Sequence, residues 1–240
     1  MSHTFRPVYR VWIVALFISG CASIQMQDLE ELLNSNLPLT EETVADGLRE
    51  ALDVGTSRTS SVLSREGGFS DNLLLRIALP EEFNAVASRL RSLGLDEQVD
   101  DFELKMNRAA ERAAVEAVDV FATAIRSMSI QDAFAILDGP QNAATEYFKL
   151  KTSAELTGRF SPHVRSAMEE VGVYVVYSSL VERYNSIPLV RPINVDLEVH
   201  IVERTLFGIF DTLAGEELRI REDPLARTTN LLKRVFGSRD

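Results

Sequence analysis

The side chains best suited to chemistry are carboxylates and amides that interrupt otherwise apolar helical patterns. Asn107 and Glu111 are four residues apart in an alanine-rich stretch, so both fall on one face of a helix. Glu217 lies within a later apolar stripe, and Arg221 follows it by four residues. A buried carboxylate can act as a general acid, and an arginine beside it can hold an anion. One hypothesis is therefore a hydrolase that uses Glu111 or Glu217 with Arg221.

The same pattern is also typical of a buried polar network that fixes the alignment of packed helices. Charges inside a protein must be paired to be tolerated, and helix registry is the best-attested use of such networks. We favour this structural interpretation, because nothing in the sequence indicates an opening to solvent beside these groups. The predicted members of the network are Asn107, Glu111, Glu217, Arg221 and Arg227.

A second polar cluster lies at 139–148, where a Gly-Pro turn precedes a helix start that carries Thr145 and Tyr147. The first turn of a helix offers free N–H groups and is a natural site for an anion. Asn142 stands at this helix start, however, and asparagine is among the preferred N-cap residues. We therefore expect Asn142 to cap its own helix, with anion binding as the alternative.

Residue types that support metal or nucleophilic catalysis are sparse. The histidines are His3, His163 and His200, and none of them belongs to a His-x-x-x-His or Glu-x-x-His pair. The sequence contains no Gly-x-Ser-x-Gly elbow, and Gly67-Gly68 is not followed by the lysine of a phosphate-binding loop. We predict no metal site, no cofactor and no catalytic residue, and an enzyme is the less favoured class.

The only cysteine, Cys21, closes a segment with the layout of a bacterial lipoprotein signal peptide. Arg6 and Arg10 precede an apolar run at 11–18, and two small residues separate this run from the cysteine. The run is shorter than the ~20 residues that a membrane-spanning helix requires. We therefore predict that residues 1–20 are removed. Cys21 then becomes the lipid attachment site, with a diacylglyceryl thioether on its sulfur and a fatty acid such as palmitate on its amine.

The predicted anchor also indicates a compartment and a charge. Ala22 follows the cysteine in place of the aspartate that commonly retains lipoproteins in the inner membrane, which favours the periplasmic face of the outer membrane. Loss of Arg6 and Arg10 leaves 23 basic residues (25 − 2) against 36 acidic ones, a formal net charge of −13. A chain this acidic argues against nucleic acid or anionic lipid headgroups as partners.

Helices must position these residues, because almost every segment after Pro38 has a helical period. The predicted helices span about 41–54, 80–93, 96–128, 129–139, 141–151, 153–160, 162–171, 174–184, 195–222 and 225–237. Only the apolar stretch near residues 72–80 is predicted to be extended, since a lone strand has no partner to pair with. The sequence thus predicts an all-α multi-helix bundle with two long helices, 96–128 and 195–222.

Several separate blocks of the chain share a pattern with one family. The blocks are Gly47-Leu48-Arg49-Glu50-Ala51-Leu52, Gly67-Gly68-Phe69, Met106-Asn107-Arg108-Ala109-Ala110-Glu111, Ala143-Ala144-Thr145-Glu146-Tyr147-Phe148, and the terminal stretch from Ile220-Arg221 through Arg227-Thr228-Thr229 to Val235-Phe236-Gly237. In this order they resemble an uncharacterised bacterial lipoprotein family, domain of unknown function number 4197, over about residues 38–237. The resemblance implies an all-helical envelope protein that carries a signal peptide. It implies no catalytic residue, because the family has no assigned activity.

The predicted organisation is a signal peptide at 1–20, an acylated N-terminus and tether at 21–37, and a single helical domain at 38–240. The favoured function is a lipid-anchored, non-enzymatic domain that binds an envelope protein or a small ligand and meets the membrane through Cys21. The alternatives are the hydrolase above, acting on envelope material, and a carrier of an apolar molecule. A carrier would need a cavity, which the sequence places among Phe121, Tyr147, Phe207 and Phe210.

Overall fold

The computed structural model describes residues 40–193, 195–227 and 229–237, all of which belong to the unit that begins at residue 39. Within these ranges the chain forms helices and connecting segments without a β-strand, which confirms the predicted all-α class. The predicted signal peptide, Cys21 and the tether lie outside the described residues. In the described part, no single helix is long and apolar enough to cross a membrane; one helix pair, Asp96–Ser127 with Ile130–Leu137, passes on length and composition but is bent by 108°.

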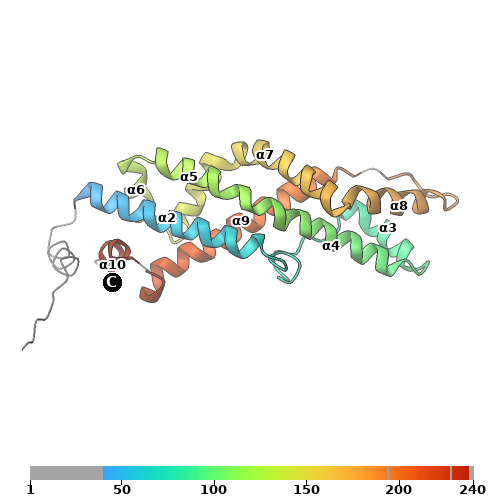
Figure 1. Cartoon of the computed structure of the whole chain (residues 1–240), viewed down its shortest axis with the longest axis horizontal. Coiled ribbons are helices and arrows are strands. Elements are labelled where there is room, and N and C mark those ends of the chain that lie inside the picture. The colour runs from blue at the N-terminus through green and yellow to red at the C-terminus, as the bar shows by residue number, and fades with distance from the viewer. Residues whose placement is uncertain (1–39, 194, 228, 238–240) are drawn as a thin grey trace, which may run out of the picture. The chain divides into compact units, whose positions relative to one another are not determined.

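Four long elements form the bundle (Figure 1). They are α2 (Glu41–Ser64), α4 (Asp96–Ala113) with its continuation α5 (Ala117–Ser127), α7 (Ala143–Val171) and α9 (Leu197–Glu222). Helix α9 packs against α2 and α7. The rod formed by α4 and α5 also packs against both α2 and α7. The shorter helices that cover this bundle are α3 (Glu81–Arg91), α6 (Ile130–Leu137), α8 (Val173–Asn185) and α10 (Asn230–Gly237).

The long helix predicted over residues 96–128 is confirmed, with one local change. A short 3₁₀ turn, η1 (Ala114–Glu116), tightens the rod between α4 and α5. At this turn the Ser60 hydroxyl of α2 donates to the Ala114 carbonyl oxygen at 3.2 Å. The alanines on this side of the rod are buried, so that neighbouring helices can approach closely. The rod ends at Met128, and Ser129 then caps α6 with a capping box completed by Asp132.

Two predicted helix ends are wrong because packing outweighs the local signals. Helix α2 does not stop before Gly55 but continues to Ser64. Gly55 lies against Leu213 and Ile220 of α9, where the missing side chain lets the two helices lie close together. The three helices predicted over 141–171 are a single helix, α7, which contains Pro162. Proline removes one helical hydrogen bond, but α7 stays continuous because its buried face continues on both sides of the proline.

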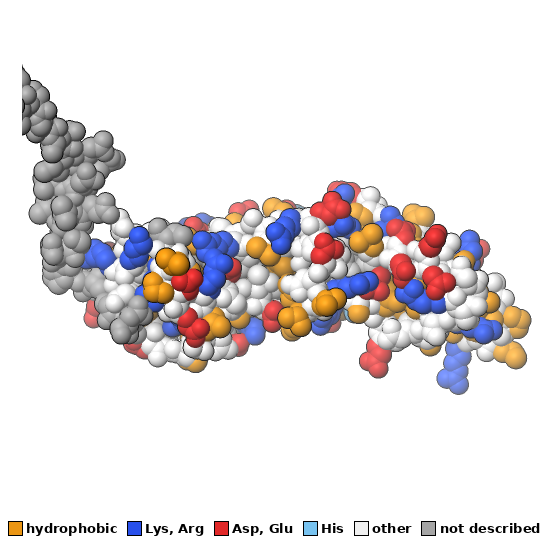
Figure 2. Space-filling view, turned by 90° about the horizontal axis from the view of Figure 1, so that it is seen from below, with side chains coloured by type: hydrophobic (Ala, Val, Ile, Leu, Met, Phe, Trp, Pro, Cys, Tyr) orange, Lys and Arg blue, Asp and Glu red, His pale blue; other side chains and the backbone are white. Residues whose placement is uncertain are grey.

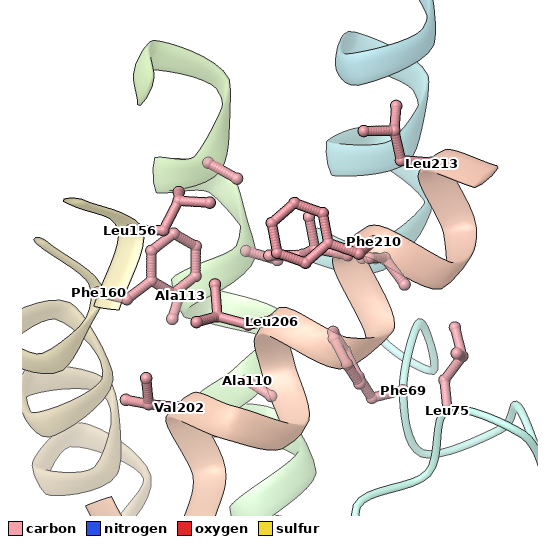
Figure 3. Close-up of a cluster of buried hydrophobic side chains, with 14 of the residues drawn as sticks. Phe69, Leu75, Ala110, Ala113, Leu156, Phe160, Val202, Leu206, Phe210 and Leu213 are labelled. Carbon is pink, nitrogen blue, oxygen red and sulfur yellow. The ribbon is translucent and has the colours of Figure 1, made fainter. Parts of the chain in front are cut away.

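The segment between α2 and α3 is neither helix nor strand over the stretch predicted to be extended. Residues 73–75 form a turn, and residues 76–80 have no regular secondary structure. Phe69, which precedes this turn, is fully buried and lies against Gly208 of α9. A Cβ atom on Gly208 would be only 2.6 Å from Phe69 Cε1, so the glycine is what admits the ring. Figure 3 shows Phe69 and Leu75 beside α9 in the buried cluster.

The C-terminal helix begins later than predicted. The Asp223-Pro224 pair starts a 3₁₀ turn, η2 (Pro224–Ala226), and α10 begins only at Asn230. Helix α10 then packs on α2 over Gly47, where a Cβ atom would be 2.6 Å from Val235 Cγ2. The buried side chains of α10 are Leu232, Val235 and Phe236. An amphipathic helix of eight residues thus closes the outer side of the α2–α9 contact.

Candidate functional site

Asn107 joins α4 to the segment that follows α2. Its side-chain oxygen accepts from Ile77 N at 2.8 Å, and its side-chain nitrogen donates to Ile77 O at 2.9 Å. The same nitrogen donates to Glu103 O at 2.8 Å. The amide is 1% exposed, and both of its polar atoms are bonded to the backbone. Asn107 therefore pairs with Ile77 as a neighbouring strand would.

Glu111, one helical turn further along α4, holds the preceding loop. Its Oε1 accepts from Phe69 N at 3.2 Å, Ser70 N at 3.1 Å and Ser70 Oγ at 3.2 Å. Its Oε2 accepts from Arg108 Nη1 at 2.5 Å. Burial tends to lower the pKa of Arg108, but the hydrogen bond and negative charge of Glu111 outweigh this effect and raise it. The carboxylate is thus surrounded by donors and paired with a cation that stays charged.

Glu217 of α9 binds the first turn of α7. Its Oε1 accepts from Ala144 N at 2.9 Å, and its Oε2 accepts from Thr145 N and Thr145 Oγ1, each at 2.9 Å. These N–H groups have no partner within their own helix, because they belong to its first turn. The negative charge also lies at the positive end of the α7 dipole. An intramolecular carboxylate therefore occupies the helix start as a bound anion would.

Two arginines in the same region donate hydrogen bonds to carbonyl groups at helix C-termini. Arg221 donates from Nε and Nη2 to Glu217 Oε1 at 3.1 and 2.9 Å, and its Nη2 also donates to Ile136 O of α6 at 2.8 Å. Arg227 donates from Nε to Ile220 O at 3.1 Å and from Nη2 to Arg221 O at 2.8 Å. Carbonyl groups in the last turn of a helix lack intrahelical donors, which these guanidinium groups supply. The ends of α6, α7 and α9 are thus linked through three side chains.

The described hydrogen bonds arrange these residues in two separate groups. Asn107 and Glu111 act on the loop after α2, whereas Thr145, Glu217, Arg221 and Arg227 act where α6, α7 and α9 meet. Tyr147 belongs to neither group. It lies edge-on against Phe148, and burial, followed by the charge of Asp132, raises the pKa of its hydroxyl.

The space beside Glu217 and Arg221 is small and apolar. The hollow there has a volume of about 20 Å³, room for about one water molecule. Apart from the two charged side chains, its lining consists of Leu48, Ala51, Leu52, Gly55, Ala144, Leu213, Ile220 and Phe236. Glu111 and Glu217 are 2% and 7% exposed. Both carboxylates are therefore almost completely covered by other atoms of the protein.

The histidines have ordinary surroundings. His163 Nε2 is 3.7 Å from Glu116 Oε2, and His200 Nε2 is 2.9 Å from Ala78 O. Among residues 40–193, 195–227 and 229–237, no group of three or more histidine, cysteine or acidic side chains could hold a metal ion.

The comparison with protein families matches residues 38–237 to the family described as a protein of unknown function, DUF4197. The chain belongs to the DUF4197 family. The match spans all of the helices described above, including both polar groups. The comparisons with curated proteins and with solved structures give no match.

The expectation for Asn142 is wrong in this DUF4197 chain. Asn142 stands at the N-cap position of α7, but its side chain accepts no hydrogen bond from a backbone N–H of the first turn, and its Nδ2 donates to Glu146 Oε1 at 3.5 Å instead. The cap comes from Glu217, 72 residues later than Thr145. In the sequence, Glu217 is visible as an interruption of an apolar stripe, and an anion site at this helix start was only the alternative to a cap by Asn142. Nothing in the sequence connects the two, because only the fold brings them together.

The aromatic side chains proposed for a carrier cavity lie in different surroundings in the DUF4197 fold. Phe121 packs edge-on against Phe148 and Phe210, with ring centroids 5.1 and 6.1 Å apart, and these rings fill the core. Phe207 is instead 48% exposed, with the Arg204 guanidinium 4.7 Å from its ring centroid. It borders an open hollow of about 150 Å³ between α7 and α9. Phe210 borders the same hollow, whereas Phe121 and Tyr147 do not line it.

Proposed function

We propose that this DUF4197 chain is a non-enzymatic, lipid-anchored domain that binds an envelope component at its surface. The observation that carries the proposal is that Glu111 and Glu217 are buried and fully engaged by backbone N–H groups, hydroxyls and arginines. A general acid or base must reach its substrate, whereas these carboxylates hold a loop and a helix end. These buried polar groups therefore support the fold, and binding of an envelope component is assigned to the surface of the domain.

The anchor in this proposal is supported by the sequence. Cys21 follows a basic and apolar leader, and two or more acyl chains give stable membrane attachment. The mature chain is strongly acidic, which suits a domain held near a membrane by lipid instead of by positive charge. The face proposed is the periplasmic side of the outer membrane.

Mass spectrometry of the full chain, expressed in a bacterium that processes lipoproteins, tests the anchor. The expected N-terminal peptide begins at Cys21 and carries the mass of a diacylglyceryl group and a further acyl chain. Cys21→Ser should lose this mass and the processed N-terminus, whereas the control Ser23→Ala should retain both. An unmodified Cys21 in the wild-type protein contradicts the anchor.

Activity and stability measurements on Glu111→Gln and Glu217→Gln test the proposal that the domain is not an enzyme. Glu111→Gln and Glu217→Gln should both lower the melting temperature, because each change introduces a donor among donors. The purified acylated protein should release no product from murein or phospholipid. A hydrolytic activity that disappears in Glu217→Gln, with an unchanged melting temperature, supports the hydrolase instead.

A further inference from the structure

Two adjacent leucines project from the loop between α2 and α3. Leu73 is 89% exposed and Leu74 is 79% exposed, although the next apolar residues, Leu75 and Ile77, are buried. Full exposure of neighbouring leucines is costly in water, and exposed apolar patches mark contacts with proteins or membranes. The packing of the domain does not account for these two side chains.

The backbone that carries the leucines is held firmly in place. Asn72 Oδ1 accepts from Leu74 N at 3.0 Å, and Asn72 O accepts from Leu75 N and Arg76 N at 3.1 and 2.8 Å. Glu111 holds the loop before this turn, and Asn107 holds the segment after it. The turn is therefore ordered before it meets a partner, and binding costs little further conformational entropy.

The charges around the leucines are balanced. Arg76 pairs with Glu103 at 2.6 Å, and Arg108 pairs with Glu66 at 2.7 Å. Residues 65–76 contain two arginines, one glutamate and one aspartate, so the loop has no formal net charge. A neutral apolar tip is compatible with zwitterionic phospholipid despite the acidity of the whole chain.

The loop projects from one edge of the helical unit. Figure 1 shows the segment after α2 and the C-terminal end of α9 at the same lower edge. The turn that follows α9 carries Leu225, which is 90% exposed. Figure 2 looks onto this edge, where hydrophobic side chains lie among charged ones of both signs. Further apolar contact can therefore form on the same side of the unit.

We propose that Leu73 and Leu74 insert to the boundary between headgroups and acyl chains in the zwitterionic phospholipid leaflet to which the chain is anchored, as a second membrane contact. The inference rests on the proposed anchor. The chain from Cys21 to Glu41 spans at most about 65 Å, and α2 from Glu41 to the loop is about 36 Å long. The leucines are therefore within reach of the leaflet.

The shape and type of these side chains favour lipid over a protein partner. A protruding pair of leucines needs no matching surface in a fluid interface. Protein contacts concentrate their binding energy in tryptophan, tyrosine and arginine, and leucine is under-represented among such residues. The anchor also raises the local lipid concentration, so that a weak insertion is effective.

Tryptophan fluorescence of the acylated full chain in vesicles tests the insertion. Trp12 is the only tryptophan and lies in the predicted signal peptide, so Leu74→Trp gives the processed protein one reporter, at the loop. The matched control is Leu150→Trp, because Leu150 is 83% exposed on α7, which runs along the opposite, upper edge in Figure 1. In phosphatidylcholine vesicles with brominated acyl chains, we expect quenching and a shift to shorter wavelength for Leu74→Trp only.

Two other results would overturn the insertion. Equal emission from Leu74→Trp with and without vesicles, in protein shown to be acylated, overturns the insertion. A spectral shift that requires added envelope protein also overturns it and identifies a protein partner. A failure of acylation contradicts the anchor and not the insertion, which is tested separately in Cys21→Ser protein expressed without residues 1–20, because the uncleaved apolar leader would itself bind vesicles. In that protein, Leu73→Ser with Leu74→Ser should lower vesicle partitioning about tenfold or more.

Discussion

Glu217 shows how one buried carboxylate can hold several structural elements. It accepts from Ala144 N, from both donors of Thr145 and from Arg221. In Glu217→Ala these groups lose their acceptor inside the protein, and Arg221 keeps a charge that is no longer paired. Removing one partner of a buried pair costs about 3 kcal/mol or more. We expect denaturant unfolding of Glu217→Ala to show a loss of this size.

Its neighbour Glu216 provides a matched control. Glu216 Oε2 lies 3.6 Å from Arg58 Nη1 and 3.4 Å from Arg219 Nη2, and its side chain is 14% exposed. Among the described residues, Glu216 Oε2 is buried without a hydrogen-bond partner, so Glu216→Ala removes none of the bonds to α7 and should be milder than Glu217→Ala. Equal losses for the two variants would show that the bonds to α7 contribute little.

Asp132 gives the fold a dependence on pH. The hydroxyl and the backbone N–H of Ser129 hydrogen-bond to Asp132 and hold the pKa of this carboxyl below its ordinary value. A lowered folded-state pKa gives stability that is present above the unfolded pKa of about 3.9 and is lost as the pH falls through the folded pKa. Asp132→Asn should therefore cost about 0.5 kcal/mol near neutral pH.

The pH dependence of this cost is the check on its cause. The difference in unfolding free energy between wild type and Asp132→Asn should disappear once the pH falls below the lowered folded-state pKa of Asp132, because the wild-type carboxyl is then protonated as well. A difference that persists in acid would attribute the effect to shape instead of charge.

At the level of residues, the sequence indicated which polar groups matter but not what they bind. Asn107, Glu111 and Glu217 were recognisable because they interrupt apolar faces. Their partners are mostly backbone atoms of distant segments, such as Ile77, 30 residues from Asn107. Backbone groups are the same in every residue, so the sequence carries no mark of them.

At the level of elements, long apolar periods predicted the helices well, whereas single glycines and prolines misled. The long helix at 96–128 was predicted almost to its ends, because its buried face repeats over many turns. Gly55 and Pro162 are local stop signals that became internal positions of α2 and α7. Tertiary contacts on both sides of each residue decided the outcome, and these contacts are not visible in a local window.

Two glycines of α9 separate helix propensity from packing. Gly208 touches Phe69, whereas a Cβ atom on Gly215 would meet nothing within 4 Å. Alanine favours a helix over glycine by about 1 kcal/mol. Gly215→Ala should therefore stabilise the protein by about 0.5–1 kcal/mol in thermal or denaturant unfolding.

Gly208→Ala should instead destabilise the protein. Its added methyl group would displace the Phe69 ring from the core, and overpacking typically costs about 1–3 kcal/mol, more than the gain in propensity. If Gly208→Ala and Gly215→Ala were equally stabilising, the contact between the loop and α9 would not be tight.

At the level of the whole molecule, α10 is a short C-terminal helix that packs on the outside of α2. It covers α2 over Gly47 and buries Leu232, Val235 and Phe236. A stop codon at position 230 should leave the helical bundle folded but expose the apolar surface around Leu48. We expect little change in far-ultraviolet circular dichroism and a clear increase in the binding of a hydrophobic dye. Complete loss of helical signal would show that α10 is essential to the core.

The long-range cap on α7 has a consequence for the order in which the chain matures. During synthesis, Ala144 and Thr145 emerge more than 70 residues before Glu217, the residue that satisfies their N–H groups. Until α9 arrives, the first turn of α7 has only water or a transient partner to bind. A nearly complete chain therefore still has unsatisfied N–H groups in the first turn of α7, and they gain their acceptor only when Glu217 has been synthesised.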